Sequence, residues 1–273
     1  MSARPAADLL PAAELSRART VAIAAATSAG ALLLRRIDSI REVRHKSAVD
    51  LVTDVDVQSE QEVCGTLLAA FPNHTILGEE GGARVQAGSD PRFRWIVDPL
   101  DGTTNYAHGF PFFCVSIGLE VEGELTLGVV YAPSLDELFV AERGGGATLN
   151  GQPMQVSATD RLQDALLATG FPYERNLLAR ALRSFDALCF RTQAVRRAGS
   201  AALDLCYVAC GRLDGYWEHQ VKPWDLAAGA LLVTEAGGTI SRVDASSFHV
   251  DGGEVLASNG GLHRQLVSAL AEA

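Results

Sequence analysis

Short runs of alternating or continuous apolar residues dominate the first half of the chain and predict β-strands there. Two longer segments are exceptions. Residues 12–40 contain an uncharged, Ala/Leu-rich stretch that predicts a packed helix, and residues 51–70 predict a short apolar segment followed by a second helix. The expected strands are residues 75–77, 95–97, 114–121, 125–131, 138–142 and 147–149.

After about residue 155 the pattern changes to an alternation of strands and helices. We expect helices over residues 176–188, 200–210, 224–236 and 261–271. The expected strands are residues 166–169, 192–196, 215–217, 239–242 and 255–257. The chain is therefore predicted to have a mixed α/β fold with three parts: a disordered segment over residues 1–11, a mostly antiparallel α+β half over 12–152, and an α/β half over 153–273.

Composition excludes several classes of function. A net charge of −10 disfavours nucleic acid as a main partner, because phosphate backbones require a basic surface. The uncharged stretch over residues 21–34 is too short to span a membrane and lacks the context of a cleaved signal peptide, so we expect no membrane partner. The five cysteines lie in or beside apolar runs, which predicts buried thiols in a reducing, cytoplasmic location.

The most informative segment ends an apolar run with two aspartates. Asp98 follows the apolar residues 95–97, and Asp101, Gly102 and Thr103 come three to five residues later. A carboxylate at the end of a buried strand carries a large desolvation penalty, which one or two bound metal ions would remove. The spacing alone fits equally well a capped turn in which Asp101 accepts backbone hydrogen bonds.

Other segments repeat this arrangement. A carboxylate lies beside an apolar run and next to a glycine or a helix start at Asp56, Glu79, Asp225 and Glu235. Carboxylates without a Cys/His cluster suit hard cations such as Mg²⁺ or Mn²⁺. Because structural carboxylates seldom recur in this way, the four segments together favour a metal site over a set of capped turns.

Residues 98–105 and 224–238 resemble the two signature regions of the inositol monophosphatase family of Mg²⁺-dependent, lithium-sensitive phosphatases, with supporting matches from about residue 46 to 259. The resemblance implies a layered α/β/α/β/α sandwich, as in this family and fructose-1,6-bisphosphatase. It also implies a homodimer, two to three Mg²⁺ per site, and a site between the two halves. Most metal ligands would come from residues 12–152.

The resemblance assigns roles residue by residue. The implied metal ligands are Glu79, Asp98, the carbonyl of Leu100, Asp101 and Asp225, with Asp98 shared between two metals. Asp56 and Thr103 would orient and deprotonate the attacking water, and Glu79 would contribute to catalysis through the metals. The implied substrate-binding groups are the N–H groups of Gly102 and Thr103, the loop residues Ser200 and Ala201, and the carboxylate of Glu218.

The predicted function is hydrolysis of inositol 1-phosphate by metal-activated water. Thr104 stands where relatives that act on adenosine bisphosphates or histidinol phosphate often carry Lys, and this favours the inositol substrate. Fructose 1,6-bisphosphate, histidinol phosphate and 3′-phosphoadenosine 5′-phosphate remain alternative small-molecule esters. A regulatory or binding protein with secondary phosphatase activity is an alternative of another class. A purely Ca²⁺-stabilised domain is disfavoured, because the ligands are scattered along the chain.

Overall fold

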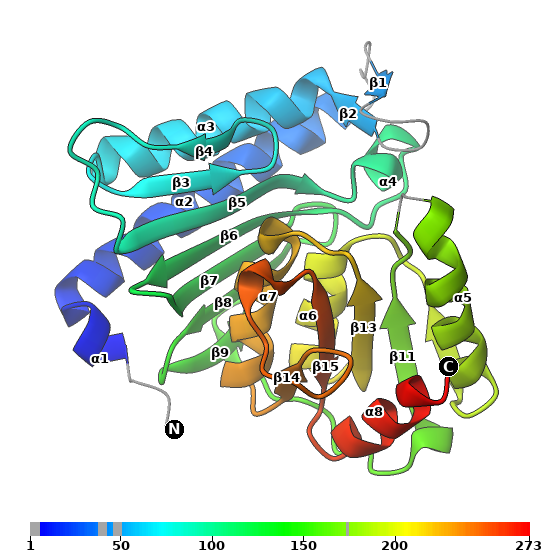
Figure 1. Cartoon of the computed structure of the whole chain (residues 1–273). Helices are drawn as coiled ribbons and strands as arrows, with labels where there is room; N and C mark the ends of the chain where they lie inside the picture. Colours follow the sequence, from blue (N-terminus) through cyan, green and yellow to red (C-terminus); the bar gives the residue numbers. More distant parts are fainter. Residues whose placement is uncertain (1–5, 38–42, 46–50, 173–174) are drawn as a thin grey trace.

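The computed structural model describes residues 6–37, 43–45, 51–172 and 175–273. Helices and sheets are stacked in five layers, in the order helix pair, eight-stranded sheet, helix pair, five-stranded sheet and helix pair (Figure 1). The predicted α/β/α/β/α arrangement is confirmed. Two clusters of buried side chains fill the spaces on either side of the eight-stranded sheet, and a third lies under the outer helices of the five-stranded sheet.

The first layer consists of α2 (Ala12–Arg36) and α3 (Asp54–Ala70), which cover one face of the eight-stranded sheet. α2 packs closely because small residues recur on its buried face, at Ala18, Ala22, Ala25, Ala26 and Ala29. Its start agrees with the prediction, and residues 38–40 of the predicted helix lie outside the described part of the chain. The paired strands β1 (Val43–His45) and β2 (Leu51–Thr53) precede α3.

The short helix α1 (Ala6–Leu9) precedes α2 and differs from the disordered segment predicted over residues 1–11. Leu10, which follows it, is buried in the same hydrophobic cluster as α2. Leu10 thus ties residues 6–11 to the fold through apolar contacts that a short sequence window does not reveal. Residues 1–5 lie outside the described residues.

The eight-stranded sheet has the order β10-β9-β8-β7-β6-β5-β3-β4, and β3 and β5 are its parallel pair. Neighbours from β5 to β10 are antiparallel, as expected for the first half. The strands are β3 (Thr75–Gly78), β4 (Gly82–Arg84), β5 (Phe93–Asp101), β6 (Cys114–Val121), β7 (Glu124–Ala132), β8 (Glu137–Glu142), β9 (Gly146–Leu149) and β10 (Gln152–Pro153).

The central helices α6 (Ala201–Ala209) and α7 (Pro223–Glu235) lie between the two sheets. Both are apolar on nearly every side, as expected for helices that are covered on two faces. Small residues bring α7 close to the eight-stranded sheet. A Cβ added at Gly118 would lie 2.7 Å from Ala227 Cβ, and one added at Gly128 would lie 2.8 Å from the Ala228 carbonyl oxygen. This contact, the glycine seam, fixes the height of α7 above β6 and β7.

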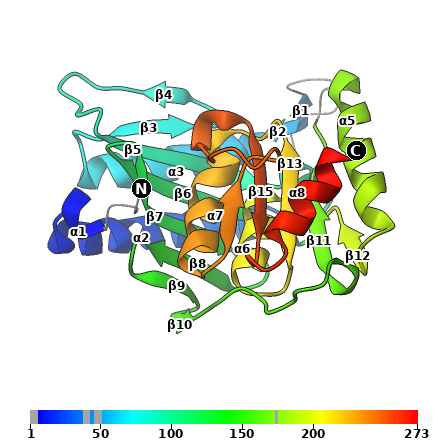
Figure 2. The ribbon, with the colours of Figure 1, turned by 60° about the horizontal axis from the view of Figure 1, so that its bottom comes forward.

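The five-stranded sheet has the order β12-β11-β13-β15-β14 and parallel pairs at β11. Its outer face is covered by α5 (Arg175–Cys189) and α8 (His263–Ala271), and the C-terminus lies beside α5 in Figures 1 and 2. The strands are β11 (Leu166–Thr169), β12 (Ala194–Arg196), β13 (Gly215–His219), β14 (Thr239–Ser241) and β15 (Glu254–Ser258).

Each sheet takes its strands from one stretch of the chain, residues 75–153 for the larger sheet and 166–258 for the smaller. The central helices of the second stretch nevertheless pack directly on the larger sheet. The two predicted halves therefore share the core between the sheets. Among the described residues, no helix combines the length and apolar composition needed to cross a membrane.

Candidate active site

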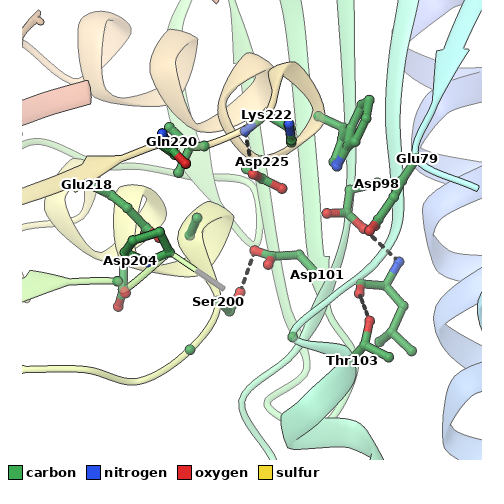
Figure 3. Close-up of a pocket in the computed structure, with 18 of the residues that line it drawn as sticks. Glu79, Asp98, Asp101, Thr103, Ser200, Asp204, Glu218, Gln220, Lys222 and Asp225 are labelled. Atoms are coloured by element: carbon green, nitrogen blue, oxygen red, sulfur yellow. Dashed lines mark hydrogen bonds between the residues drawn. The ribbon is translucent and has the colours of Figure 1, made fainter. Parts of the chain in front are cut away.

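A cavity of about 560 Å³ opens where β5, α6, α7 and β13 converge (Figure 3). It is lined by the predicted site residues Glu79, Asp98, Leu100, Asp101, Gly102, Thr103, Ser200, Ala201, Glu218 and Asp225. Asp56 is buried and is connected to the cavity by the hydrogen bond that it accepts from the Thr103 hydroxyl. The structure therefore brings all the predicted site residues together, although they come from six separate segments of the chain.

The end of β5 directs Asp98 and Asp101 toward the same cavity. Residues three apart on a regular strand point to opposite faces, but the pairing of β5 with β6 shifts register between these two aspartates. The backbone N–H of Leu100 donates a 3.0 Å hydrogen bond to Asp98 Oδ1 and holds that carboxylate in place. The Asp-Pro-Leu-Asp sequence thus produces a local irregularity that makes the two side chains converge.

Asp101 is held by the start of α6. Its Oδ2 accepts hydrogen bonds from the Ser200 hydroxyl and from the backbone N–H of Ala202, both at 2.7 Å. Ser200 Oγ also accepts a hydrogen bond from the N–H of Leu203 and caps the helix. The Ser200 hydroxyl is therefore already engaged with a carboxylate, and the contact of Ser200 with a substrate ring stays a prediction.

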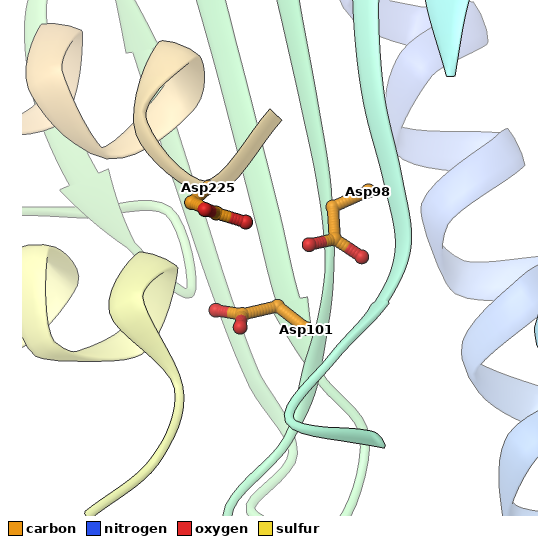
Figure 4. Close-up of side chains that lie close together, drawn as sticks. All are labelled: Asp98, Asp101 and Asp225. Atoms are coloured by element: carbon orange, nitrogen blue, oxygen red, sulfur yellow. The ribbon is translucent and has the colours of Figure 1, made fainter. Parts of the chain in front are cut away.

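Asp225 completes a group of three carboxylates. It is the third residue of α7, and its Oδ2 accepts a 2.7 Å hydrogen bond from the N–H of Lys222. One oxygen each from Asp98, Asp101 and Asp225 lies within 4.8 Å of the others, and the three side chains point toward one another (Figure 4). Asp225 is thus both a residue of the helix start and a member of the carboxylate cluster.

Burial and mutual repulsion make this cluster electrostatically unfavourable without a cation. Burial raises the pKa of Asp101 to about 6. The pKa of Asp98 is held well above its usual range by burial first and then by the charges of Glu79, Asp101 and Asp225. The pKa of Asp225 is raised in the same way, by burial first and then by the charge of Asp101. A hard divalent cation would relieve this repulsion, and the oxygen-only donor set fits one. The residues present therefore suit Mg²⁺ or Mn²⁺.

Thr103 connects the cavity to Asp56. Its hydroxyl donates to Asp56 Oδ1 at 2.9 Å and lies 3.1 Å from the carbonyl oxygen of Leu100. Thr103 is the first residue of the short helix α4 (Thr103–Ala107), which follows Gly102 at φ 97°. A side chain at Gly102 would also lie 2.9 Å from the Phe112 carbonyl oxygen, so glycine permits both the backbone angle and the close packing.

Glu79 lines the cavity on a loop that is supported by Glu60, a residue missed by the sequence analysis. The buried Glu60 carboxylate accepts hydrogen bonds from the N–H of Glu80 at 2.7 Å and from Arg84 at 2.5 Å. A Cβ at Gly78 or Gly81 would lie 2.5 or 2.7 Å from its oxygens. The loop that carries Glu79 therefore packs against the buried carboxylate of Glu60, a residue of α3.

The other end of the cavity, away from Asp98 and Glu79, has a different polar lining (Figure 3). Glu218 on β13 accepts a hydrogen bond from the Tyr216 hydroxyl, and burial raises the pKa of Glu218 to about 7. Asp204 on α6 lies at the same end and is 2 % exposed. Asp204 was not predicted as a site residue, although it is an acid within the apolar run of residues 201–209. Gln220 was not predicted as a cavity residue either.

Comparison with known proteins identifies the family to which this fold belongs. The model of the inositol monophosphatase family matches residues 14–273. The chain belongs to this family. Its members are metal-dependent phosphatases, and the cluster of Asp98, Asp101 and Asp225 agrees with that chemistry. The chain is accordingly a phosphatase of the inositol monophosphatase type that acts on small phosphate esters.

Similar proteins extend along nearly the whole chain. An inositol-1-monophosphatase of Synechocystis is 47 % identical over 92 % of this chain and 88 % of its own length. A Pseudomonas aeruginosa protein named Nus factor SuhB is 44 % identical, with 92 % and 94 % covered. The crystal structure of the extragenic suppressor protein suhB from Bartonella henselae has a TM-score of 0.89 at 39 % identity, with 93 % and 98 % covered.

Proposed function

We propose that this member of the inositol monophosphatase family hydrolyses inositol 1-phosphate in a Mg²⁺-dependent reaction. The observation that carries the proposal is the convergence, in one cavity, of three clustered aspartates, the Thr103–Asp56 pair and the acidic Glu218. These groups supply metal ligands, a proton acceptor and a hydrogen-bond acceptor for a polyol. The name of the Synechocystis relative supports the choice of substrate.

The metal ligands in this proposal are Glu79, Asp98, the carbonyl of Leu100, Asp101 and Asp225, which would hold two to three Mg²⁺, with Mn²⁺ as a substitute. When bound, Mg²⁺ would neutralise phosphate charge, lower the pKa of the attacking water and stabilise the leaving oxygen. The hydrogen bonds from Leu100 N–H, Ser200 and Ala202 N–H orient two of these carboxylates before any ligand arrives. Orientation in advance lowers the reorganisation needed in the reaction.

Thr103 and Asp56 orient and deprotonate the attacking water. Since the Thr103 hydroxyl donates its proton to Asp56 Oδ1, the lone pairs of its oxygen are available to accept a hydrogen bond from water. As the water attacks phosphorus, its proton passes to Thr103 Oγ1 while the threonine proton shifts to Asp56. The buried carboxylate thus acts as the final proton acceptor, and threonine relays the proton.

Phosphate and polyol occupy different parts of the cavity. The backbone N–H groups of Gly102 and Thr103, at the start of α4, bind phosphate oxygens, because the first N–H groups of a helix lack intrahelical acceptors. Ala201 contacts the polyol ring together with its neighbour Ser200, whose hydroxyl remains on Asp101. Glu218 accepts hydrogen bonds from substrate hydroxyls.

The proposal extends to the setting in which the enzyme works. We expect a cytoplasmic homodimer that is inhibited by Li⁺ and has neither a nucleic-acid nor a membrane partner. A reducing compartment is supported by the five cysteines, all of which are free thiols. The net charge of −10 supports the absence of a nucleic-acid partner.

A substrate panel tests this proposal directly. Phosphate release is measured with millimolar Mg²⁺, and again with EDTA, on inositol 1-phosphate, fructose 1,6-bisphosphate, histidinol phosphate and 3′-phosphoadenosine 5′-phosphate. The highest kcat/KM is expected for inositol 1-phosphate, and EDTA should abolish it. A higher value for another ester would retain the metal chemistry and overturn the substrate assignment.

A regulatory or binding protein with secondary phosphatase activity is the second candidate function. The observation that favours considering it is the similarity to a protein named Nus factor SuhB. The same panel separates the two functions. Phosphate release from none of the four esters would favour the regulatory function, despite the intact cluster of carboxylates.

A further inference from the structure

Asp204 is an acidic side chain of the cavity that the assigned roles leave unused. It lies in the first turn of α6, is 2 % exposed, and lines the cavity together with Glu218 and Arg197. The three predicted metal ligands of the cluster lie nearer the opposite end (Figure 3). Asp204 is therefore placed beside the part of the cavity that is available to the non-phosphate part of a substrate.

The Asp204 carboxylate has no hydrogen-bond donor within the described chain. Its backbone N–H donates to the Ser200 carbonyl oxygen in the helix, but no described residue donates to its side-chain oxygens. The side-chain atoms that are both sealed from solvent and unpartnered in the described chain do not include the Asp204 oxygens, which face the cavity. A carboxyl group that faces a cavity without a protein donor takes its hydrogen bonds from water or from a ligand. The position therefore suits a ligand that brings donors.

Neighbouring groups indicate which ligand that is. Asp204 and Glu218 line the same end of the cavity (Figure 3), and the charge of Glu218 is, after burial, the largest influence that raises the pKa of Asp204. Arg197 also lines the cavity and lowers the pKa of both carboxyl groups, although burial leaves each pKa above its ordinary value. Because a guanidinium nearby disfavours a bound cation, the matching ligand is neutral and rich in hydroxyl donors.

Gly170 leaves room for the Glu218 carboxylate. A Cβ at position 170 would overlap the Glu218 carboxylate, so only glycine allows the strand end of β11 to lie this close. Tyr216 fixes one oxygen of Glu218 from the other side. Glu218 is thus held in one orientation next to the unpartnered Asp204.

We propose that Asp204 is a specificity-determining residue that, together with Glu218, accepts hydrogen bonds from two hydroxyl groups of a polyol phosphate. The inference rests on the proposed phosphatase function and deepens it. It assigns to the site a substrate class with at least two hydroxyls within reach of the paired carboxylates. Simple aryl phosphates, which lack these hydroxyls, gain nothing from Asp204.

The test compares Asp204→Ala and Asp204→Asn with the wild-type enzyme at saturating Mg²⁺. The substrates are inositol 1-phosphate and p-nitrophenyl phosphate. Losing a hydrogen bond to the Asp204 carboxyl group should lower kcat/KM for inositol 1-phosphate about 10- to 100-fold in Asp204→Ala, and leave p-nitrophenyl phosphate within about two-fold. Asp204→Asn, which keeps one acceptor oxygen, should lose less than Asp204→Ala. The Tm of both variants should equal or exceed that of the wild type.

Asp214→Asn is the matched control. Asp214 is also a buried aspartate of the second half, but its carboxylate is satisfied by Ser157 and the N–H of Leu166, away from the cavity. This variant should lower Tm and leave the ratio of the two kcat/KM values unchanged. A structural role for Asp204 predicts the same behaviour in Asp204→Asn, and equal losses on both substrates together with a lower Tm would overturn the proposal.

Failure of the proposed substrate is distinguishable from failure of this inference. If the wild type prefers fructose 1,6-bisphosphate, the inositol assignment fails, and a selective loss on that sugar phosphate in Asp204→Ala still supports the role of Asp204. If the wild type hydrolyses p-nitrophenyl phosphate as well as every polyol ester, hydroxyl recognition is absent and the inference is wrong.

Discussion

The two ends of the cavity differ in how their carboxylates are held. At the end proposed to bind metal (the metal end), Asp98, Asp101 and Asp225 each accept at least one hydrogen bond from a backbone N–H. At the end proposed to bind the polyol (the polyol end), the Glu218 carboxylate accepts a hydrogen bond from the Tyr216 hydroxyl, and Asp204 has no donor among the described residues. The carboxylates are thus oriented by the main chain at the first end, and by one side chain or by no described donor at the second.

The difference follows from what each end must do. Positioning of phosphate and water allows little error, so the ligands there benefit from orientation by rigid elements. Recognition of a polyol needs acceptors whose hydrogen-bonding capacity is unused until substrate binds. Substitutions at the metal end should therefore affect every substrate equally, whereas those at the polyol end should affect only substrates with hydroxyls.

Asp98→Asn should have the largest effect, because it removes a charge from the centre of the cluster. We expect kcat to fall by about 10³-fold on every ester, the loss typical of removing one major electrostatic contact. Steady-state phosphate release from inositol 1-phosphate and p-nitrophenyl phosphate measures it. Retention of more than about a tenth of wild-type activity would contradict a shared metal ligand at this position.

Glu218→Ala should have a smaller and selective effect. Loss of its acceptor should reduce kcat/KM for inositol 1-phosphate about 30-fold and leave p-nitrophenyl phosphate nearly unchanged. Competition between the two substrates in one reaction measures the ratio directly. Equal losses on both would remove the distinction between the two ends.

Glu60→Gln tests whether the metal end depends on support from outside the cavity. The substitution removes the charge that binds Arg84 and weakens the acceptor of the Glu80 N–H, so the Glu79 loop loses its anchor. The Mg²⁺ concentration for half-maximal activity should rise about 10-fold, as for other supports of metal ligands, while kcat at saturating Mg²⁺ recovers. Arg84→Gln should shift it less. An unchanged Mg²⁺ requirement with a lower kcat would argue against this role.

The smallest expected effect is the change with pH in the stability that the folded protein gains from Mg²⁺. The folded-state pKa of Asp101 is raised from 3.8 to about 6, so without metal the folded protein retains a proton that the unfolded chain releases between these values. The metal-free protein therefore loses stability as pH rises from about 4 to 6. Mg²⁺ displaces that proton, and its gain in Tm should be larger at pH 8 than at pH 5. Differential scanning calorimetry with Mg²⁺ or EDTA measures the gain in Tm at both pH values. An equal gain at pH 5 and pH 8 would refute competition between Mg²⁺ and the proton on Asp101.

The local sequence was sufficient to predict a site residue where a carboxylate suited to binding a cation also interrupts or follows an apolar run. Asp98, Asp101 and Asp225 each interrupt or follow an apolar run, and the structure places all three in one cluster. Glu60 and Asp204 were missed because an acid within a helical segment is ordinarily solvent-exposed. Their burial depends on the Gly78–Gly81 loop and on the second sheet, which come from distant parts of the chain.

Ser200 illustrates a different limit. The sequence predicted Ser200 as a site residue, and it lines the cavity, but the partner of its hydroxyl is decided by where α6 meets β5. Similarly, α1 contains too little apolar pattern to predict its packing, and Leu10 shows that one buried side chain can order a terminal segment. Contacts of this kind depend on three-dimensional packing and not on sequence spacing.

The glycine seam between α7 and the larger sheet also affects how readily such an enzyme can acquire new substrate preferences. With Gly118 and Gly128 holding α7 at a fixed height, Asp225 keeps its distance from Asp98 when residues on the facing side of the cavity are exchanged. A combinatorial library at positions 204, 218 and 220 should therefore yield catalysts with new substrate preferences at high frequency. The same library built on a Gly118→Ala background should yield few active clones.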